Sequence, residues 1–143
     1  MKNLSQYIGV AYRRSQVFYN EQMSSVGLTS GQYMYIIAIC EEEGLSQDDL
    51  AHQLHIDKGT VANVLAKLEE KGFVSRKVNK EDKRGREVYT TEKAQKAYEL
   101  ALHARDEWHR RLTADFSEAE TKMFEKLLEK SMHNAECHCR NLT

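Results

Sequence analysis

The chain has 143 residues, of which 41% are hydrophobic and 30% are charged, and its formal net charge is -1. This length suits one domain with a real core, no run approaches the roughly 20 apolar residues of a membrane span, and residues 1–6 lack the apolar stretch of a secretion signal. These features exclude a membrane protein and predict a cytoplasmic one. The absence of proline favours long, uninterrupted helices.

An apolar stripe at helical spacing predicts a first long helix at the N-terminus. Its members are Leu4, Tyr7, Ile8, Ala11, Tyr12, Ser15 and Phe18. Further along, Cys40 follows a run of isoleucines and is predicted to be buried as a small hydrophobic side chain.

Residues 46–72 contain two predicted helices joined by a short turn. Ser46 and Asp49 are typical of a capping box, so the first helix is expected to start at Ser46 and to end near Leu54. Asp57 is a good N-cap for the second helix, and Gly72 stands where its C-terminal stop is expected. The shared core of a helix-turn-helix would consist of Leu50, Leu54, Ile56, Val61 and Leu65. The alternative is an ordinary helical hairpin in a bundle.

The opposite face of the second helix carries side chains that suit a DNA groove. Asn63 can form a bidentate pair with adenine, Thr60 can hydrogen-bond a base or a phosphate, and Ala62 can touch a thymine methyl group. The candidate DNA-binding residues on this helix are Lys58, Gly59, Thr60, Ala62, Asn63 and Lys67.

A basic turn between two stretches rich in β-branched and aromatic residues comes next. Residues 73–78 and 86–90 are predicted to form the two strands of a hairpin. Between Arg76 and Arg86, six basic residues oppose two acidic ones, so phosphate is the expected partner. An exposed hairpin that only aids solubility is the alternative. Because the hairpin follows a helix-turn-helix, we favour a winged DNA-binding unit in which Lys83, Arg84 and Arg86 contact DNA, with an arginine in the minor groove.

The predicted helix-turn-helix and the predicted wing both contain residues that recur together in a known family. In the helix-turn-helix they are Leu50, Ala51, Leu54, Ile56, Thr60, Val61, Val64, Leu65, Leu68, Glu69 and residues 71–74, and in the wing they are residues 82–86, Val88 and residues 91–93. With these residues the chain resembles the MarR family of bacterial winged-helix transcription regulators. The resemblance implies that Asp82 holds the turn of the wing, which also contains Gly85, and that Arg84 enters the minor groove.

The chain departs from the family pattern in two places. The family often has Ser or Thr followed by Arg in the middle of its recognition helix, where this chain has Ala62 and Asn63. It also usually reads Leu-Thr-x-x-Gly after the wing, where this chain has residues 90–94 as Thr-Thr-Glu-Lys-Ala. The second change affects a strand-to-helix junction more than any DNA contact.

Two more helices are predicted after the wing. One runs from about Glu92 to Leu112, and Ser117 with Glu120 forms a plausible capping box for the other. The inward residues of the first are Ala94, Ala97, Tyr98, Ala101, Leu102, Trp108 and Leu112, and the apolar stripe of the second is Phe116, Ala119, Met123, Phe124, Leu127, Leu128 and Met132.

The apolar helices lie at both ends of the chain, at about residues 1–28 and 92–143, and the DNA-binding unit lies between them at about residues 29–91. Pairing the ends of two chains would form a homodimer with two recognition helices one DNA turn apart, as a palindromic operator requires. The resemblance implies dimerisation of this kind. A monomeric bundle is the alternative. The predicted fold is a single mainly α (α+β) domain, residues 1–143, with a small β-hairpin wing and long terminal dimerisation helices.

The resemblance also implies release from DNA when a small aromatic or phenolic effector binds between the dimer helices and the winged unit. Aromatic residues at helical spacing are more often ordinary core, so no effector-binding residue is assigned. The candidates are Tyr12, Tyr19, Tyr33, Tyr35, Tyr98 and Trp108.

The C-terminus gathers Cys and His side chains, which are preferred zinc and copper ligands and are also redox-active. They are His133, Cys137, His138 and Cys139. A compact zinc site usually has two separated ligand pairs, whereas these all lie at one end. A tail without a role is the alternative, although two tails at a dimer interface could share a metal or a disulfide. No other cofactor is expected.

Catalytic motifs are missing: the chain has no HExxH, no Gly-rich phosphate loop and no Ser-centred elbow, so an enzyme is not expected. The sequence predicts a homodimeric regulator of double-stranded DNA, a repressor of a palindromic operator that a small-molecule, metal or redox signal releases. The alternatives are a winged-helix protein-interaction module without a DNA role and a metal or redox sensor.

Overall fold

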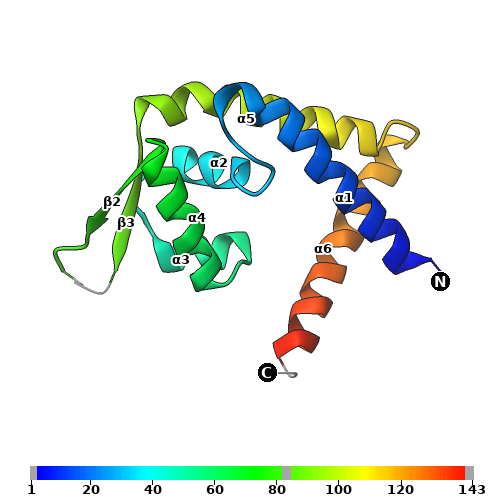
Figure 1. Cartoon of the computed structure of the whole chain (residues 1–143). Coiled ribbons are helices and arrows are strands. Elements are labelled where there is room, and N and C mark those ends of the chain that lie inside the picture. The colour runs from blue at the N-terminus through cyan, green and yellow to red at the C-terminus, as the bar shows by residue number, and fades with distance from the viewer. Residues whose placement is uncertain (1–2, 82–84, 141–143) are drawn as a thin grey trace. The chain divides into compact units, whose positions relative to one another are not determined.

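The computed structural model describes residues 3–81 and 85–140, which form a mainly helical chain with a small antiparallel sheet (Figure 1). Its elements in chain order are α1 (Leu4–Met23), the 3-10 turn η1 (Ser24–Val26), α2 (Tyr33–Glu41), β1 (Leu45–Ser46), α3 (Gln47–Leu54), α4 (Lys58–Glu70), β2 (Val74–Val78), β3 (Arg86–Thr90), α5 (Glu92–Leu112) and α6 (Glu118–Arg140). The chain divides into two compact units, the first ending at Trp108 and the second beginning at His109. The predicted fold class, a winged helix with long terminal helices, is confirmed.

The two central helices begin where their capping residues predict. The Ser46 side chain accepts a hydrogen bond from the Asp49 backbone N–H at 2.9 Å, and the Asp57 carboxylate accepts one from the Thr60 N–H at 2.8 Å. Each bond satisfies a backbone donor that the first turn of a helix leaves unpaired. After α4 the chain reverses at Gly72, whose φ of 82° is a conformation that favours glycine.

The sheet has the strand order β1-β3-β2, and all its pairs are antiparallel. Arg76 on β2 and Leu45 on β1 both lie opposite Val88, which is fully buried in the central strand. The hairpin of β2 and β3 confirms the predicted wing strands. The two-residue strand β1 was not predicted, and it ties the start of α3 to the wing.

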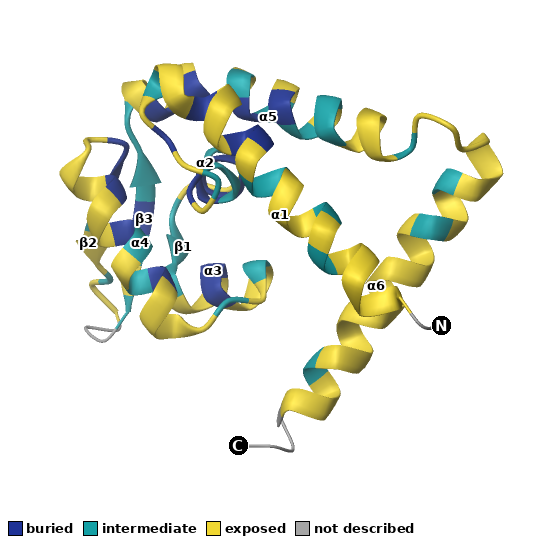
Figure 2. Ribbon diagram, turned by 45° about the vertical axis from the view of Figure 1, so that its right-hand side comes forward, coloured by how far each residue is buried: buried dark blue, intermediate teal, exposed yellow. Residues whose placement is uncertain are grey.

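The core of the first unit forms around α2, which lies beneath α5 and has α3 and α4 on its other side (Figure 1). Its buried side chains include Tyr35, Ile36, Ile39, Leu50, Val61, Leu65, Leu68, Phe73 and Val88 (Figure 2, dark blue). Leu54 and Ile56 pack against this core but are only half-buried. On α5 the buried positions are all alanines, Ala94, Ala97, Ala101 and Ala104, and such small side chains allow close approach to the core.

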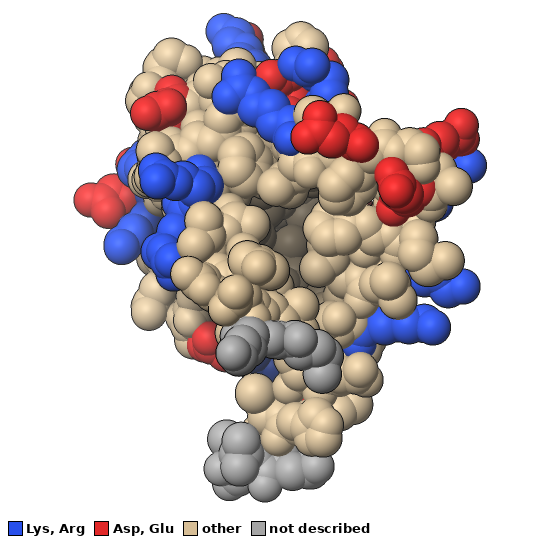
Figure 3. All heavy atoms as spheres, turned by 90° about the vertical axis from the view of Figure 1, so that its right-hand side faces the viewer, with Lys and Arg blue, Asp and Glu red and all other residues tan. Residues whose placement is uncertain are grey.

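The terminal helices expose apolar side chains in the single chain, and much of the face shown in Figure 3 carries no charge. From the predicted α1 stripe only Phe18 is buried, and Leu112, predicted to face inward, is 37% exposed. The predicted capping box of α6 is present: Glu120 N–H donates to Ser117 Oγ at 3.1 Å, and Ser117 N–H donates to the Glu120 carboxylate at 2.8 Å. None of the helices in the described ranges is long and apolar enough to span a bilayer.

Candidate nucleic-acid interface

The amphipathic pattern of α4 separates a buried face from an exposed polar one. Val61, Leu65 and Leu68 are fully buried in the core. Five of the six predicted contact residues are exposed, whereas Ala62 is half-buried and less accessible than predicted. The exposed ones are Lys58, Gly59, Thr60, Asn63 and Lys67.

Two polar contacts occupy the first turn of α4. Lys58 Nζ lies 3.1 Å from Asp48 Oδ2, and both side chains are exposed, so this ion pair contributes little stability. The Thr60 hydroxyl donates to Asp57 Oδ2 at 2.7 Å. Hydrogen bonds from the side chain and backbone of Thr60 lower the pKa of Asp57. Because its proton is engaged in the cap, the Thr60 hydroxyl is predisposed to accept, not donate, a hydrogen bond.

The wing is described on both sides of its tip. Asp82, Lys83 and Arg84 lie outside the described residues, so their predicted roles stay predictions. Gly85 is half-buried, and its carbonyl accepts a hydrogen bond from the Asn79 N–H at 3.0 Å, which closes the described part of the hairpin. Arg86, at the start of β3, is exposed. A polar cleft beside it is lined by Ser46, Gln47, Asp48, Asp49, Asn79, Gly85 and Arg86.

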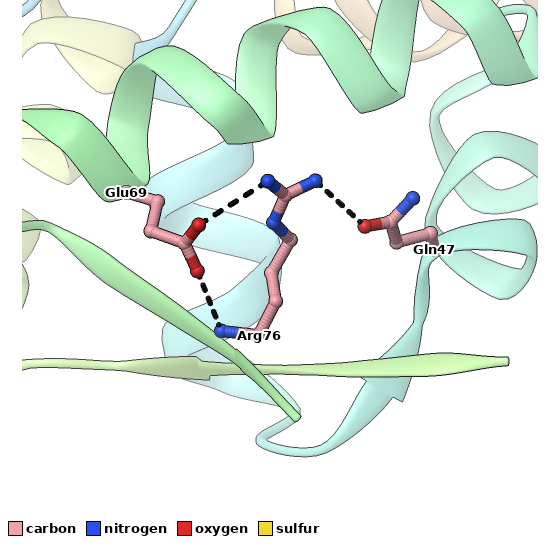
Figure 4. A network of polar contacts seen from close by, with 3 residues as sticks. All are labelled: Gln47, Glu69 and Arg76. Atoms are coloured by element: carbon pink, nitrogen blue, oxygen red, sulfur yellow. Dashed lines mark hydrogen bonds and ion pairs between the residues drawn. The ribbon is translucent and has the colours of Figure 1, made fainter. Parts of the chain in front are cut away.

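Arg76 is not available to DNA, so the predicted count of basic residues on the wing is too high by one. It is one of the six basic residues counted there, yet its side chain is only 13% exposed and is held inside the winged unit. Its guanidinium donates to Glu69 on α4 and to Gln47 on α3 (Figure 4). The hydrogen bond from the Arg76 side chain, with a second from the Arg76 backbone, lowers the pKa of Glu69. Sequence reasoning missed this role because Gln47, Glu69 and Arg76 lie on three different elements, which only the tertiary fold brings together.

A cavity of about 260 Å³ lies between α1, α2 and α4. Four of the six predicted aromatic residues line it, Tyr12, Tyr19, Tyr33 and Tyr35, and α4 contributes Thr60 and Val64. Tyr19 and Tyr33 stack with ring centroids 3.9 Å apart. Burial is the main cause of the raised pKa of Tyr19, Tyr33 and Tyr35.

The other two aromatic candidates do not line this cavity. Tyr98 donates a hydrogen bond to Glu41 at 3.1 Å, and Trp108 packs against Phe18 with ring centroids 5.3 Å apart. Both are therefore parts of the scaffold in the first unit.

The C-terminal cysteines lie on α6 and are exposed. Residues two apart on a helix do not face each other, so Cys137 and Cys139 cannot form a disulfide within an intact α6. Within residues 3–81 and 85–140, no three His, Cys, Asp or Glu side chains are grouped so that they could hold a metal ion. The metal and redox roles of His133, Cys137, His138 and Cys139 stay predictions.

Comparison with known proteins agrees with this geometry. The sequence profile of the MarR family matches residues 28–85, which span α2 to the tip of the wing. The chain is 30% identical to the HTH-type transcriptional regulator BilQ of Clostridium symbiosum, a match that covers 85% of each protein. The chain belongs to the MarR family.

Two further proteins match over nearly the whole chain. The HTH-type transcriptional regulator YybA of Bacillus subtilis is 28% identical over 95% of this chain and 91% of its own. A MarR family transcriptional regulator from Listeria monocytogenes, solved in complex with a 26mer DNA, superposes with a TM-score of 0.86 at 31% identity, and the match covers 94% of this chain and 89% of that one. As a MarR-family member, the protein is a DNA-binding transcription regulator and not an enzyme.

Proposed function

We propose that this MarR-family protein is a homodimeric repressor that occupies a palindromic operator and is released by a small aromatic molecule. The observation that carries the proposal is the exposed polar face of α4 beside a hairpin whose Arg86 is also exposed. A recognition helix and a basic wing on one scaffold provide groove contacts and phosphate contacts together. The relative from Listeria was solved with DNA bound, which supports the same use of the fold here.

Roles for the individual residues follow from their chemistry. Asn63 reads a base edge, while Lys58 and Lys67 neutralise phosphates. Thr60 and Gly59 allow the start of α4 to approach the DNA closely. On the wing, Arg86 contacts the backbone with Lys83, and Arg84 enters the minor groove beside the turn that Asp82 and Gly85 shape.

Exposed apolar side chains on the terminal helices support the homodimer. On α1 they include Leu4, Tyr7 and Ile8, and on α6 Met123, Leu127 and Leu128, each more than 40% exposed. Apolar side chains in such number are costly to leave in water and mark an interaction surface. A twofold axis between two chains would cover both stripes and present two recognition helices to one face of DNA.

The tyrosine-lined cavity supports control by a small aromatic molecule. The Tyr35 hydroxyl is buried and has no hydrogen-bond partner among the described residues. A buried polar group without a partner is costly, and a ligand hydroxyl or carboxylate could satisfy it. Because Thr60 and Val64 of α4 also line the cavity, an occupant would touch the recognition helix directly.

A mobility-shift experiment on genomic fragments tests this function. We expect the purified protein to retain a discrete fragment that carries an inverted repeat, and we expect small phenols or aromatic carboxylic acids to release it. Replacement of Tyr35 by Phe should weaken that release without weakening DNA binding. Failure to retain any fragment, even at low salt, would contradict the repressor and favour a protein-interaction module.

A further inference from the structure

The side chain of Arg76, which is 13% exposed, connects three elements of the winged unit. Its Nη2 donates to Glu69 Oε1 at 3.2 Å and its backbone N–H donates to Glu69 Oε2 at 3.1 Å, so both oxygens of one carboxylate hold β2 against the C-terminal end of α4. Its Nη1 donates to Gln47 Oε1 at 3.1 Å at the start of α3 (Figure 4). One side chain thus holds the wing against both helices of the helix-turn-helix.

Stability alone does not explain this arrangement. The Nε of Arg76 is buried without a hydrogen-bond partner among the described residues. The Glu69 side chain is 41% exposed, so its ion pair with Arg76 is partly solvated and contributes little stability. An arginine instead fixes the orientation of its partners, because its planar guanidinium donates hydrogen bonds only in fixed directions.

Through the pairing of β2 with β3, the position of Arg76 also sets the position of Arg86, which is proposed to contact DNA. Arg76 lies opposite Val88 and Val78 lies opposite Arg86, so the anchored strand fixes where Arg86 begins β3. We propose that Arg76 is a positioning residue, which sets the wing relative to α4 through Glu69 and Gln47 so that both bind one duplex at the same time. The inference rests on the proposed DNA-binding function, and Arg76 itself does not touch DNA.

Glu69 and Glu70, neighbours on α4, allow a test in which the direction of the change in DNA affinity is decisive. Removing a carboxylate near DNA reduces repulsion, so Glu70→Ala should leave affinity unchanged or raise it. If Glu69 positions the wing, Glu69→Ala should instead lower affinity, by about fivefold or more. The probe is a mixed-sequence duplex at low salt, together with any fragment that the wild-type protein retains.

A second variant covers the case in which Glu69→Ala unfolds because it leaves a largely covered guanidinium without its carboxylate. Arg76→Met removes the charge while filling similar space, so its thermal midpoint should stay near that of the wild-type protein while DNA affinity falls. If the wing has lost its position, Arg86→Ala should cost at least about threefold less in the Arg76→Met background than alone. Independent, multiplying effects would overturn the proposal.

The outcomes distinguish the proposed DNA-binding function from the positioning role of Arg76. A wild-type protein that binds no duplex would refute the proposed function. A wild-type protein that binds, with Glu69→Ala behaving as Glu70→Ala does, would refute only the positioning role of Arg76.

Discussion

Basic residues around the winged unit differ in what their side chains touch. Lys67 and Arg86 are exposed, whereas Lys58 is exposed but paired with Asp48. Arg76 is largely covered, and its guanidinium is shared between Glu69 and Gln47. Exposure and pairing, not charge alone, therefore decide which cations are available for phosphates. The net charge of -1 does not oppose DNA binding, because the interface is local.

Asn63 is predicted to read a base, so Asn63→Ala should change the preference at one base step, by about 1–3 kcal/mol, and leave other steps unchanged. Quantitative binding to a set of singly substituted operators measures this. Lys67→Ala is the matched control, since a phosphate contact weakens binding to all sequences alike. Equal losses at every site for Asn63→Ala would mean that Asn63 is a phosphate contact.

The individual residues of the candidate site are predictable from the sequence where they lie on a single helix. The exposed face of α4 follows from the positions of its apolar residues and the Asp57 cap, and helical periodicity then places Asn63 and Lys67. Arg76 could not be placed, because its partners come from two other elements. The half-burial of Ala62 likewise depends on tertiary packing and not on the pattern of α4.

Among the elements, those with a clear pattern were predicted closely. The bounds of α5 agree with the prediction, from Glu92 to Leu112, and α6 follows its predicted cap. Helix α2 was not predicted, because Tyr35, Ile36, Ile37, Ala38 and Ile39 are all buried. A segment that is apolar on every side has no periodicity to read. Strand β1 is only two residues long and depends on β3, more than 40 positions away.

The elements also set the reactivity of the cysteines. Cys40 on α2 was predicted to be buried but is only half-buried. Desolvation still raises its pKa to about 11, so its thiol stays protonated and unreactive at pH 8. Cys137 and Cys139 on α6 are exposed. Iodoacetamide at pH 8 should therefore alkylate these two first, as peptide mass spectrometry would show. Equally fast modification of Cys40 in the folded protein would contradict the burial of α2.

In the whole molecule, the proposed homodimer makes DNA affinity depend on the exposed apolar stripes of α1 and α6. Leu127 is 51% exposed in the single chain, an unfavourable position for leucine unless a partner covers it. A dimer presents two recognition helices at once, so the second half-site is bound at a high effective concentration. Loss of the dimer should therefore weaken operator binding even though α4 and the wing remain folded.

Leu127→Glu tests that link, because it would bring two carboxylates close to an apolar interface. Sedimentation should show monomers at concentrations at which the wild-type protein is a dimer, and operator affinity should fall by at least about tenfold. Lys126→Glu introduces the same side chain at the adjacent exposed position. The idea fails if both variants stay dimeric, or if monomeric Leu127→Glu binds the operator as tightly as the wild-type protein.

The most direct test of the account is the affinity of Arg84→Ala for the operator, measured across a range of salt concentrations. If the wing and α4 bind one duplex together, this change should cost about 1–3 kcal/mol and leave the dimer intact. The dependence of log K on log salt should also become shallower, by up to about one phosphate contact. Affinity and salt dependence equal to those of the wild-type protein would contradict the assignment of the wing.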